Sequence, residues 1–248
     1  MITNNNSIPN SSSLTPHSYK YFDIIMSLFV VILLLSNIAS SAKIVDLGFS
    51  LLGIHLAFDG GTLLFPIAYV LGDILTEVYG FKASRRVIWT GFAALALAAL
   101  VFFTLRMLPP EALWEAKTGT AAYDSVLGGM SGGGIVAASL AAYWVGEFSN
   151  SALHSRIKVL MKGRLYWVRN IGSSLAGELL DSLIFISVAC AAGVFPWALF
   201  WSLALTNYLL KIAIEVMLYP ANFAVVHALK KREGVDVYDV GIKYKPIG

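Results

Sequence analysis

The sequence predicts an all-α, polytopic membrane protein with six transmembrane helices. Of its 248 residues, 57% are hydrophobic and 13% are charged, whereas soluble domains carry about 25% charged residues. Each apolar segment is close to the roughly 20 residues that a membrane-spanning helix needs, and longer than the roughly 9–11 residues of a membrane strand. The segments are 21–42, 62–80, 86–108, 129–151, 168–192 and 198–228. The last one either runs past the bilayer or bends at Pro220.

Lysine and arginine predict the orientation of these segments. The two tails and the connections on one side hold fourteen basic residues, while the other side holds Lys43, Arg106 and Lys117. Cytoplasmic loops carry such an excess, so we expect both termini to be cytoplasmic and the protein to lie in the inner membrane. The basic connections are short, so the net charge of +3 indicates topology and contact with lipid headgroups. It predicts no nucleic-acid partner.

The chain divides into three parts. Residues 1–20 are rich in Ser and Asn and lack the basic start of a cleavable signal, which predicts a disordered cytoplasmic tail. Residues 21–232 form the predicted six-helix domain, and residues 233–248 form a cytoplasmic C-terminal tail. The alternating pattern of residues 43–61 predicts a short hairpin or a re-entrant cap on the outer face. We interpret residues 109–128 as an outer loop rather than the cover of a pocket.

Six carboxylates interrupt the apolar segments, and each would cost roughly 2.5–3.5 kcal/mol at the bilayer centre. This cost predicts a polar pocket, closed to lipid, that receives a polar solute. Residues four apart share a helix face, and Asp73 and Glu77 have this spacing; the fifth segment again places two acids on one face. The second and fifth segments run in opposite directions, as in an inverted repeat of three plus three helices, although the shared pattern is short enough to arise by chance. The six acids are Asp73, Glu77, Glu147, Glu178, Asp181 and Glu215.

Other polar residues within the segments leave alternatives open. Lys211 lies four residues before Glu215, so it neutralises this acid within the helix or pairs with another acid across the bundle. Asn37 lines the pocket or holds two helices together. Pro66 predicts a ligand-lining kink. Glycine and alanine at 128–142 predict close helix packing, within the monomer or in a homodimer.

We expect no metal and no cofactor. The single Cys190 forms no internal disulfide, and the four histidines lie in predicted tails, loops or span ends without a metal-ligand arrangement. We interpret all four histidines as having no special role.

Several motifs together resemble one known family. The run from Phe65-Pro66 through Asp73 to Thr76-Glu77-Val78-Tyr79-Gly80 resembles the signature of the queuosine precursor transporter family, formerly called putative vitamin uptake transporters. The resemblance extends over about residues 20–232. It departs at Glu147 and Asn150, where many members have an amide and an acid. Its further matches are 139–151, Arg169, Ser173-Ser174, Gly177-Glu178, Asp181-Ser182, Lys211, Glu215 and Pro220.

The resemblance implies import of 7-deazaguanine precursors of the tRNA base queuosine, namely the 7-cyano compound, with the 7-aminomethyl compound as a second candidate. A carboxylate can accept N1–H and the exocyclic amine of a guanine-like edge as a fork. We expect Glu178 or Glu77 to form it, with Asp73 and Asp181 in support. The expected substrate-binding residues are Asn37, Phe65, Asp73, Glu77, Glu147, Arg169, Glu178, Asp181, Lys211 and Glu215.

The main alternative is the substrate-binding subunit of an energy-coupling-factor type vitamin importer, which would need a separate ATPase. An intramembrane aspartyl enzyme built on Asp73 and Asp181 is a weaker alternative, and we expect no enzymatic activity. The energy source stays open between proton-coupled, facilitated and ATPase-driven uptake.

Overall fold

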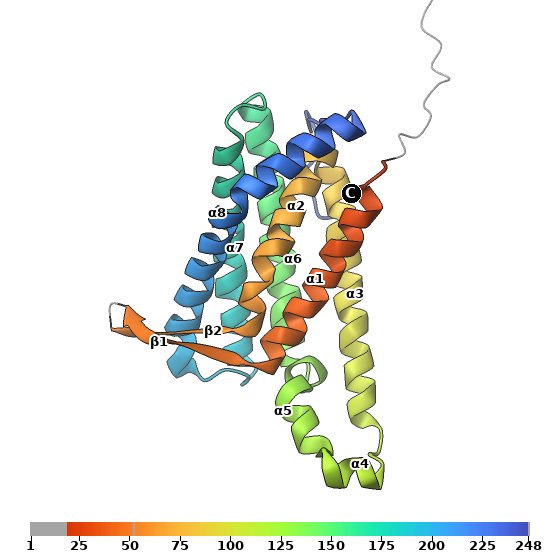
Figure 1. Cartoon of the computed structure of the whole chain (residues 1–248), viewed down its shortest axis with the longest axis vertical. Coiled ribbons are helices and arrows are strands. Elements are labelled where there is room, and N and C mark those ends of the chain that lie inside the picture. Colours follow the sequence, from red (N-terminus) through yellow and green to blue (C-terminus); the bar gives the residue numbers. More distant parts are fainter. Residues whose placement is uncertain (1–18, 52, 248) are drawn as a thin grey trace, which may run out of the picture.

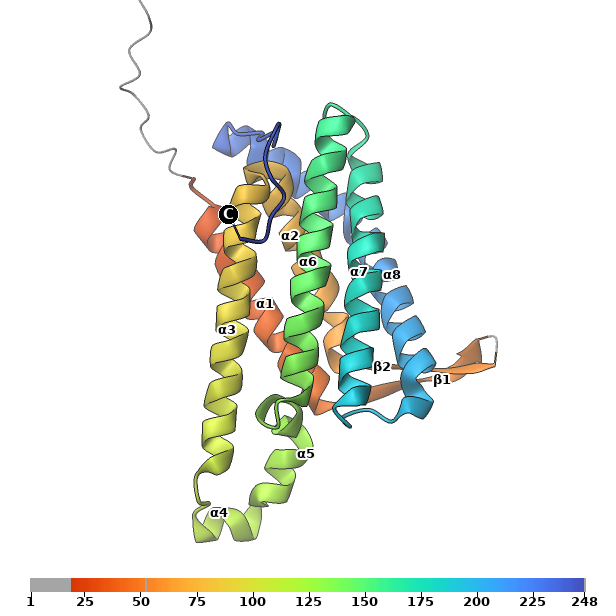
Figure 2. The same cartoon turned by 180° about the vertical axis from the view of Figure 1, so that it is seen from behind.

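The computed structural model describes residues 19–51 and 53–247, so the predicted tail at 1–20 falls almost entirely outside the described residues. Long helices packed side by side form a bundle (Figures 1 and 2). The predicted all-α membrane class is confirmed, because five helical stretches of the described chain are long and apolar enough to cross a membrane. The bundle helices are α1 (Phe22–Ala42), α2 (Phe65–Tyr79), α3 (Phe81–Met107), α6 (Gly134–Leu160), α7 (Tyr166–Ala191) and α8 (Phe200–Glu233).

The helix α2 differs from the other predicted spans. Its 15 residues extend about 22 Å at 1.5 Å per residue, which is less than the hydrocarbon thickness of about 30 Å. All its residues except Ile67 and Leu71 are buried, against α1, α3, α6 and α8. Six full-length transmembrane helices are therefore not confirmed. The inverted repeat is also unconfirmed, since α7, the counterpart of α2, has 26 residues.

A hairpin and one turn of 3-10 helix lead into α2. The antiparallel strands β1 (Ile44–Leu51) and β2 (Ile54–Asp59) confirm the predicted hairpin, which lies across one end of the bundle (Figure 1). The turn η1 (Gly60–Leu63) follows. Asp59 stabilises this junction, because it accepts hydrogen bonds from Ser40 of α1, from the Gly61 amide at 3.0 Å and from Asn207 of α8 at 2.8 Å. Pro66 lies in the first turn of α2, where a missing N–H has no cost, so the predicted kink is wrong.

The connection between α3 and α6 is helical, so its interpretation as a loop is wrong. It contains α4 (Ala112–Lys117) and α5 (Gly119–Ser131). Glu111 begins α4 by accepting a hydrogen bond from the Trp114 amide at 2.8 Å. Gly133 has φ of +82°, a conformation that glycine adopts at little cost. The chain therefore breaks between α5 and α6, and the fourth long helix begins at 134 rather than 129.

The last helix and the C-terminal tail pack on the end of the bundle where α1 begins. After the turn η2 (Trp197–Leu199), α8 continues through Pro220 to Glu233, so the last segment is one continuous helix of 34 residues. The Glu233 carboxylate accepts hydrogen bonds from the amides of Lys20 and Tyr21, at 3.0 and 2.8 Å. Residues 234–247 then fold back, and the Val237 amide donates to the Val78 carbonyl at 3.3 Å.

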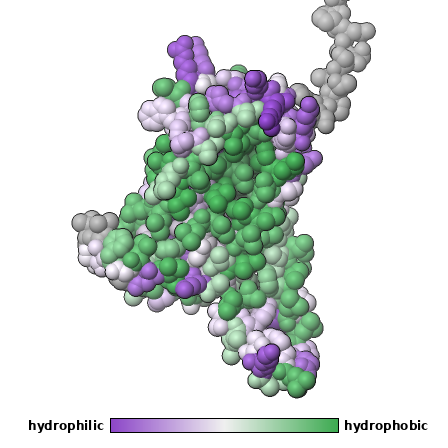
Figure 3. Space-filling view, viewed as in Figure 1, coloured by the Kyte–Doolittle hydropathy of each residue, from purple (hydrophilic) through white to green (hydrophobic). Residues whose placement is uncertain are grey.

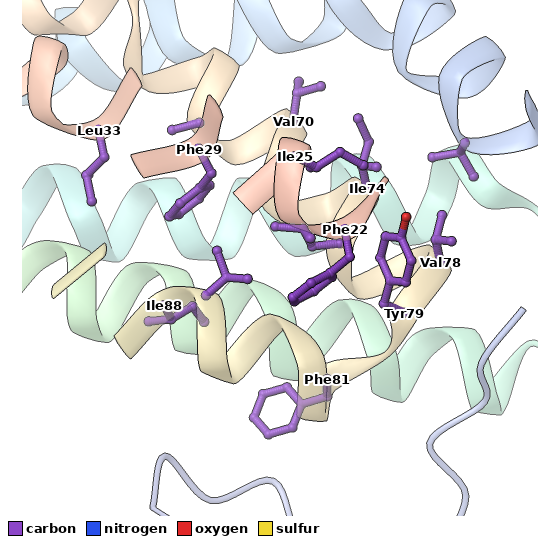
Figure 4. Packing of buried hydrophobic residues seen from close by; sticks show 14 of the residues in the cluster. Phe22, Ile25, Phe29, Leu33, Val70, Ile74, Val78, Tyr79, Phe81 and Ile88 are labelled. Atoms are coloured by element: carbon purple, nitrogen blue, oxygen red, sulfur yellow. The ribbon is translucent and has the colours of Figure 1, made fainter. Parts of the chain in front are cut away.

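The surface and the core agree with a membrane location. Hydrophobic residues cover the middle of the bundle in Figure 3, and hydrophilic residues gather at its two ends. Inside, one cluster joins α1, α2 and α3 (Figure 4), where Phe22 and Phe29 of α1 lie near Ile74 and Val78 of α2 and Ile88 of α3. This packing holds the polar face of α2 towards α6, α7 and α8.

Candidate functional site

Buried polar side chains form two groups inside the bundle. The first, here called the cation cluster, consists of Glu77 with His154, Lys158, Arg169 and Lys230. Arg169 donates to both Glu77 oxygens, at 2.8 and 2.9 Å, and His154 Nε2 lies 3.0 Å from Glu77 Oε2. Lys230 is ion-paired with the same carboxylate, and Lys158 donates to the Glu77 carbonyl at 2.6 Å. The Glu77 carboxylate is thus fully engaged by protein cations.

Asp73 is also fully engaged, although mainly by neutral groups. Asn150 donates to it at 2.9 Å, Asn170 donates to its other oxygen, and Ser174 does so at 3.3 Å. His154 Nδ1 lies 3.5 Å from Asp73, so the imidazole stands between the two acids of α2. The expected face shared by Asp73 and Glu77 is confirmed, and α6 and α7 provide its partners.

The second group, here called the acid cluster, lacks such partners. It consists of Glu147, Glu178, Glu215 and Tyr69, together with the pair Asp181–Lys211. The three glutamates are exposed by only 1%, 0% and 2%. Neither oxygen of Glu178 or Glu215 has a hydrogen-bond partner among the described residues, and Glu147 Oε1 and the Tyr69 hydroxyl also have none. Buried unsatisfied polar groups cost about 1–3 kcal/mol each, so this cluster is a strong candidate for ligand binding.

Lys211 pairs with Asp181 of α7, across the bundle. Of the two alternatives that the spacing left open, the structure shows the one between helices. The Lys211 ammonium also lies 4.9 Å from the centre of the Phe65 ring, which places the first residue of α2 beside the acid cluster. Asp181 and Lys211 neutralise each other and leave the three glutamates without a cation of their own.

A glycine precedes three of the acids, and the structure shows why. A Cβ on Gly146 would lie 3.1 Å from the Gly177 carbonyl, and a Cβ on Gly177 would lie 2.7 Å from Asn150 Cβ. A Cβ on Gly72 would overlap the Glu147 carboxylate. Close approach of helix backbones in lipid uses such small residues. The glycines therefore let α2, α6 and α7 bring their acids together.

The predicted site residues divide between the two clusters. Asn37 is fully buried, donates to the Leu33 carbonyl of its own helix at 2.9 Å, and has no partner for its own oxygen. The acid cluster contains Phe65, Glu147, Glu178, Asp181, Lys211 and Glu215, while Asp73, Glu77 and Arg169 lie in or beside the cation cluster.

Four partners of the α2 acids were missed from the sequence. The interpretation of His154 as a histidine without a role is wrong, because it is fully buried between Asp73 and Glu77. Lys158 and Lys230 are among the fourteen basic residues that indicate topology, and Asn170 is absent from the expected site residues. A signal was present: Asn150, His154 and Lys158 are spaced four apart, which places them on one face of a helix.

The C-terminal tail closes the cation cluster at the end of the bundle. Asp236 is ion-paired with Lys158 and with Lys230, in the latter case at 2.9 Å. Asp239 accepts hydrogen bonds from the Phe81 amide at 2.8 Å and from Ser155 at 2.6 Å. The tail is therefore attached to α3, α6 and α8 by two carboxylates.

Replacing both carboxylates, in Asp236→Asn/Asp239→Asn, is expected to release the tail. Hydrogen bonds to charged groups contribute about 1.5–3 kcal/mol each, so the amides of residues 235–245 should exchange with deuterium at least about tenfold faster. Exchange followed by mass spectrometry measures this. Asp23→Asn, at an exposed position of α1, is the control. Unchanged protection of the tail in the double variant would show that these contacts do not hold it.

The fold and the buried clusters define a multi-pass membrane protein whose polar interior is enclosed by an apolar surface. A family described as putative vitamin uptake transporters matches residues 59–225. The chain belongs to this family, that of the queuosine precursor transporters, as its motifs indicated.

Curated relatives agree with the family assignment. The chain is 24% identical over 220 residues to a probable queuosine precursor transporter of Bacillus subtilis, covering 84% of this chain and 93% of that protein. It is 25% identical over 198 residues to the queuosine precursor transporter of Escherichia coli, covering 79% and 84%. A probable queuosine precursor transporter of Haemophilus influenzae is 26% identical over 67% of each chain. No solved structure matches.

Proposed function

We propose that this protein imports 7-deazaguanine precursors of queuosine across the inner membrane, and that the acid cluster binds the guanine-like edge of the substrate. The names of the three relatives support the substrate class. Both ends of the described chain lie at one end of the bundle, which agrees with two cytoplasmic termini. The acid cluster supplies the chemical argument.

The proposal rests on the chemical element of the buried side-chain atoms that have no hydrogen-bond partner among the described residues. All of them are oxygen atoms, and no unpaired nitrogen accompanies them among the described side chains. Carboxylate and amide oxygens accept hydrogen bonds, so a ligand rich in N–H donors satisfies them. A guanine-like edge has N1–H and an exocyclic amine side by side, which suits a carboxylate fork. The unpaired atoms belong to Asn37, Tyr69, Glu147, Asn150, Glu178, Ser182, Thr206 and Glu215.

Of the two acids that the sequence favoured for the fork, we assign Glu178. The Glu77 carboxylate is occupied by Arg169, His154 and Lys230, and a ligand would have to displace them. Both Glu178 oxygens are unpaired. Lys211 and Asp181 act on Glu178 through their charges, so the pair supports the pocket without blocking it.

Binding by the detergent-purified protein tests this assignment. Titration calorimetry should give a micromolar or tighter Kd for 7-cyano-7-deazaguanine. An analogue without the exocyclic amine should bind at least about tenfold more weakly, since a buried acceptor is then left unpaired. Folded protein that binds neither 7-cyano-7-deazaguanine nor the 7-aminomethyl compound would overturn the proposed function.

Reconstitution of this chain alone into liposomes separates the proposal from the alternative of an energy-coupling-factor subunit. Uptake without any ATPase partner is the expected result. Binding without uptake would instead support the substrate-binding subunit. Cross-linking in the same liposomes tests a homodimer.

A further inference from the structure

Glu147 has different surroundings from the other two unpaired glutamates. It lies where α6 meets α2, against the backbone of Gly72, and a Cβ at Gly72 would overlap Glu147 Oε1. Glu147 is 1% exposed, and this oxygen has no hydrogen-bond partner among the described residues. Glu147 Oε1 therefore occupies the place that a Cβ at position 72 would take, and the backbone of α2 closes this side of the carboxylate.

Within residues 19–51 and 53–247, no cation compensates a negative charge on Glu147. The groups that face it are Tyr69 and Asp73 from α2 and Glu178 and Asp181 from α7, and Tyr143 lies one turn away on α6. The cations nearest to these acids are already engaged, Lys211 by Asp181 and His154 by Glu77.

A buried carboxylate without a cation is very costly in a medium of low dielectric constant. The α2 backbone leaves no room for a ligand on the Gly72 side of the carboxylate, and no group of metal-ligating side chains occurs among the described residues, whereas a proton occupies almost no volume. The geometry therefore selects a proton as the partner of Glu147 in this closed arrangement.

We propose that Glu147 binds the proton that is transported together with the substrate. This inference rests on the proposed function. A proton from water forms an O–H bond with the Glu147 carboxylate, and the same bond breaks when the bundle opens to the opposite side and water reaches this acid. Glu178 and Tyr69 face Glu147 and also belong to the proposed substrate site. A bound substrate therefore changes the proton affinity of Glu147, and a proton on Glu147 changes the affinity for substrate.

The experiment uses the full chain in liposomes that contain a pH-sensitive dye. Addition of 7-cyano-7-deazaguanine should acidify the lumen. With one proton per neutral substrate, an inward gradient of about one pH unit should raise the accumulation ratio about tenfold. Glu147→Gln should lose both the acidification and the response to the gradient, by a larger factor than it loses exchange of labelled for unlabelled substrate. Glu115→Gln, at an exposed position of α4, is the matched control.

Two results would overturn the inference. Wild-type uptake without acidification and without a response to the gradient would exclude proton coupling. Acidification that persists in Glu147→Gln would exclude this residue as the site.

Infrared spectroscopy of the substrate-free protein provides a second readout, which depends neither on uptake nor on a single variant. The carbonyl band of a protonated carboxylic acid at neutral pH should disappear in Glu147→Gln and shift in Glu147→Asp. Absence of a band sensitive to these changes would also overturn the inference. If the band behaves as expected but no deazaguanine binds, the proton site stands and the proposed function fails.

Discussion

Glu178→Gln is expected to weaken binding of 7-cyano-7-deazaguanine about 10- to 150-fold, because a hydrogen bond to a charged group contributes about 1.5–3 kcal/mol. The glutamine amide retains one acceptor and replaces the other with a donor, which then faces a donor of the ligand. Both Glu178 oxygens are buried and lack a hydrogen-bond partner among the described residues, so the protein groups that the change affects are its charged neighbours, Glu215, Lys211 and Asp181. Titration calorimetry on the purified variant measures the effect.

A double-mutant cycle assigns the loss to the guanine-like edge. The variant and the wild type are each titrated with the substrate and with an analogue that lacks the exocyclic amine. If Glu178 reads this amine, the analogue should bind the two proteins almost equally. Glu115→Gln serves again as the exposed control. Equal losses for both ligands would assign Glu178 to the general polarity of the pocket instead.

The positions of the acids could be predicted from the sequence because charged residues are rare inside apolar segments. All six lie within the bundle helices and are buried, and Asp73 and Glu77 share one face of α2. The hairpin before α2 followed from alternation of residue types. Such signals depend only on residues that are close in the chain, so they do not change with the contacts that the helices make in the folded protein.

The partners of these acids could not be predicted in the same way, because pairing depends on contacts between distant segments. Glu77 meets Arg169 of α7 and Lys230 of α8, which are 92 and 153 residues away in the chain. Basic residues near the ends of spans are already explained as topology signals. Their second role, pairing with Glu77, therefore could not be recognised from the sequence. The short length of α2 was missed as well, since the last residues of η1 extend its apolar pattern in the predicted segment 62–80.

The cation cluster gives the second large effect: Arg169→Met is expected to destabilise the protein by about 3–5 kcal/mol, the usual cost of removing one partner from a buried ion pair. Arg169 is 3% exposed and also donates to the carbonyls of Gly163 and Arg164, at 2.9 and 2.8 Å. Its loss therefore removes the hydrogen bonds that hold the connection between α6 and α7, and it also removes two of the hydrogen bonds to the Glu77 carboxylate. Thermal unfolding in detergent measures the change, and Arg164→Met, at an exposed position of the same connection, should have almost no effect.

The double variant Glu77→Gln/Arg169→Gln distinguishes a structural ion pair from one that transport requires. Removing both charges avoids an uncompensated buried carboxylate, so most of the lost stability should return. Lys158 and Lys230 would then pair with Asp236 alone. If uptake stays low in this stable double variant while substrate binding is normal, the cation cluster acts in the conformational change. Normal uptake would instead restrict the cluster to folding, because the acid cluster would then carry transport without it.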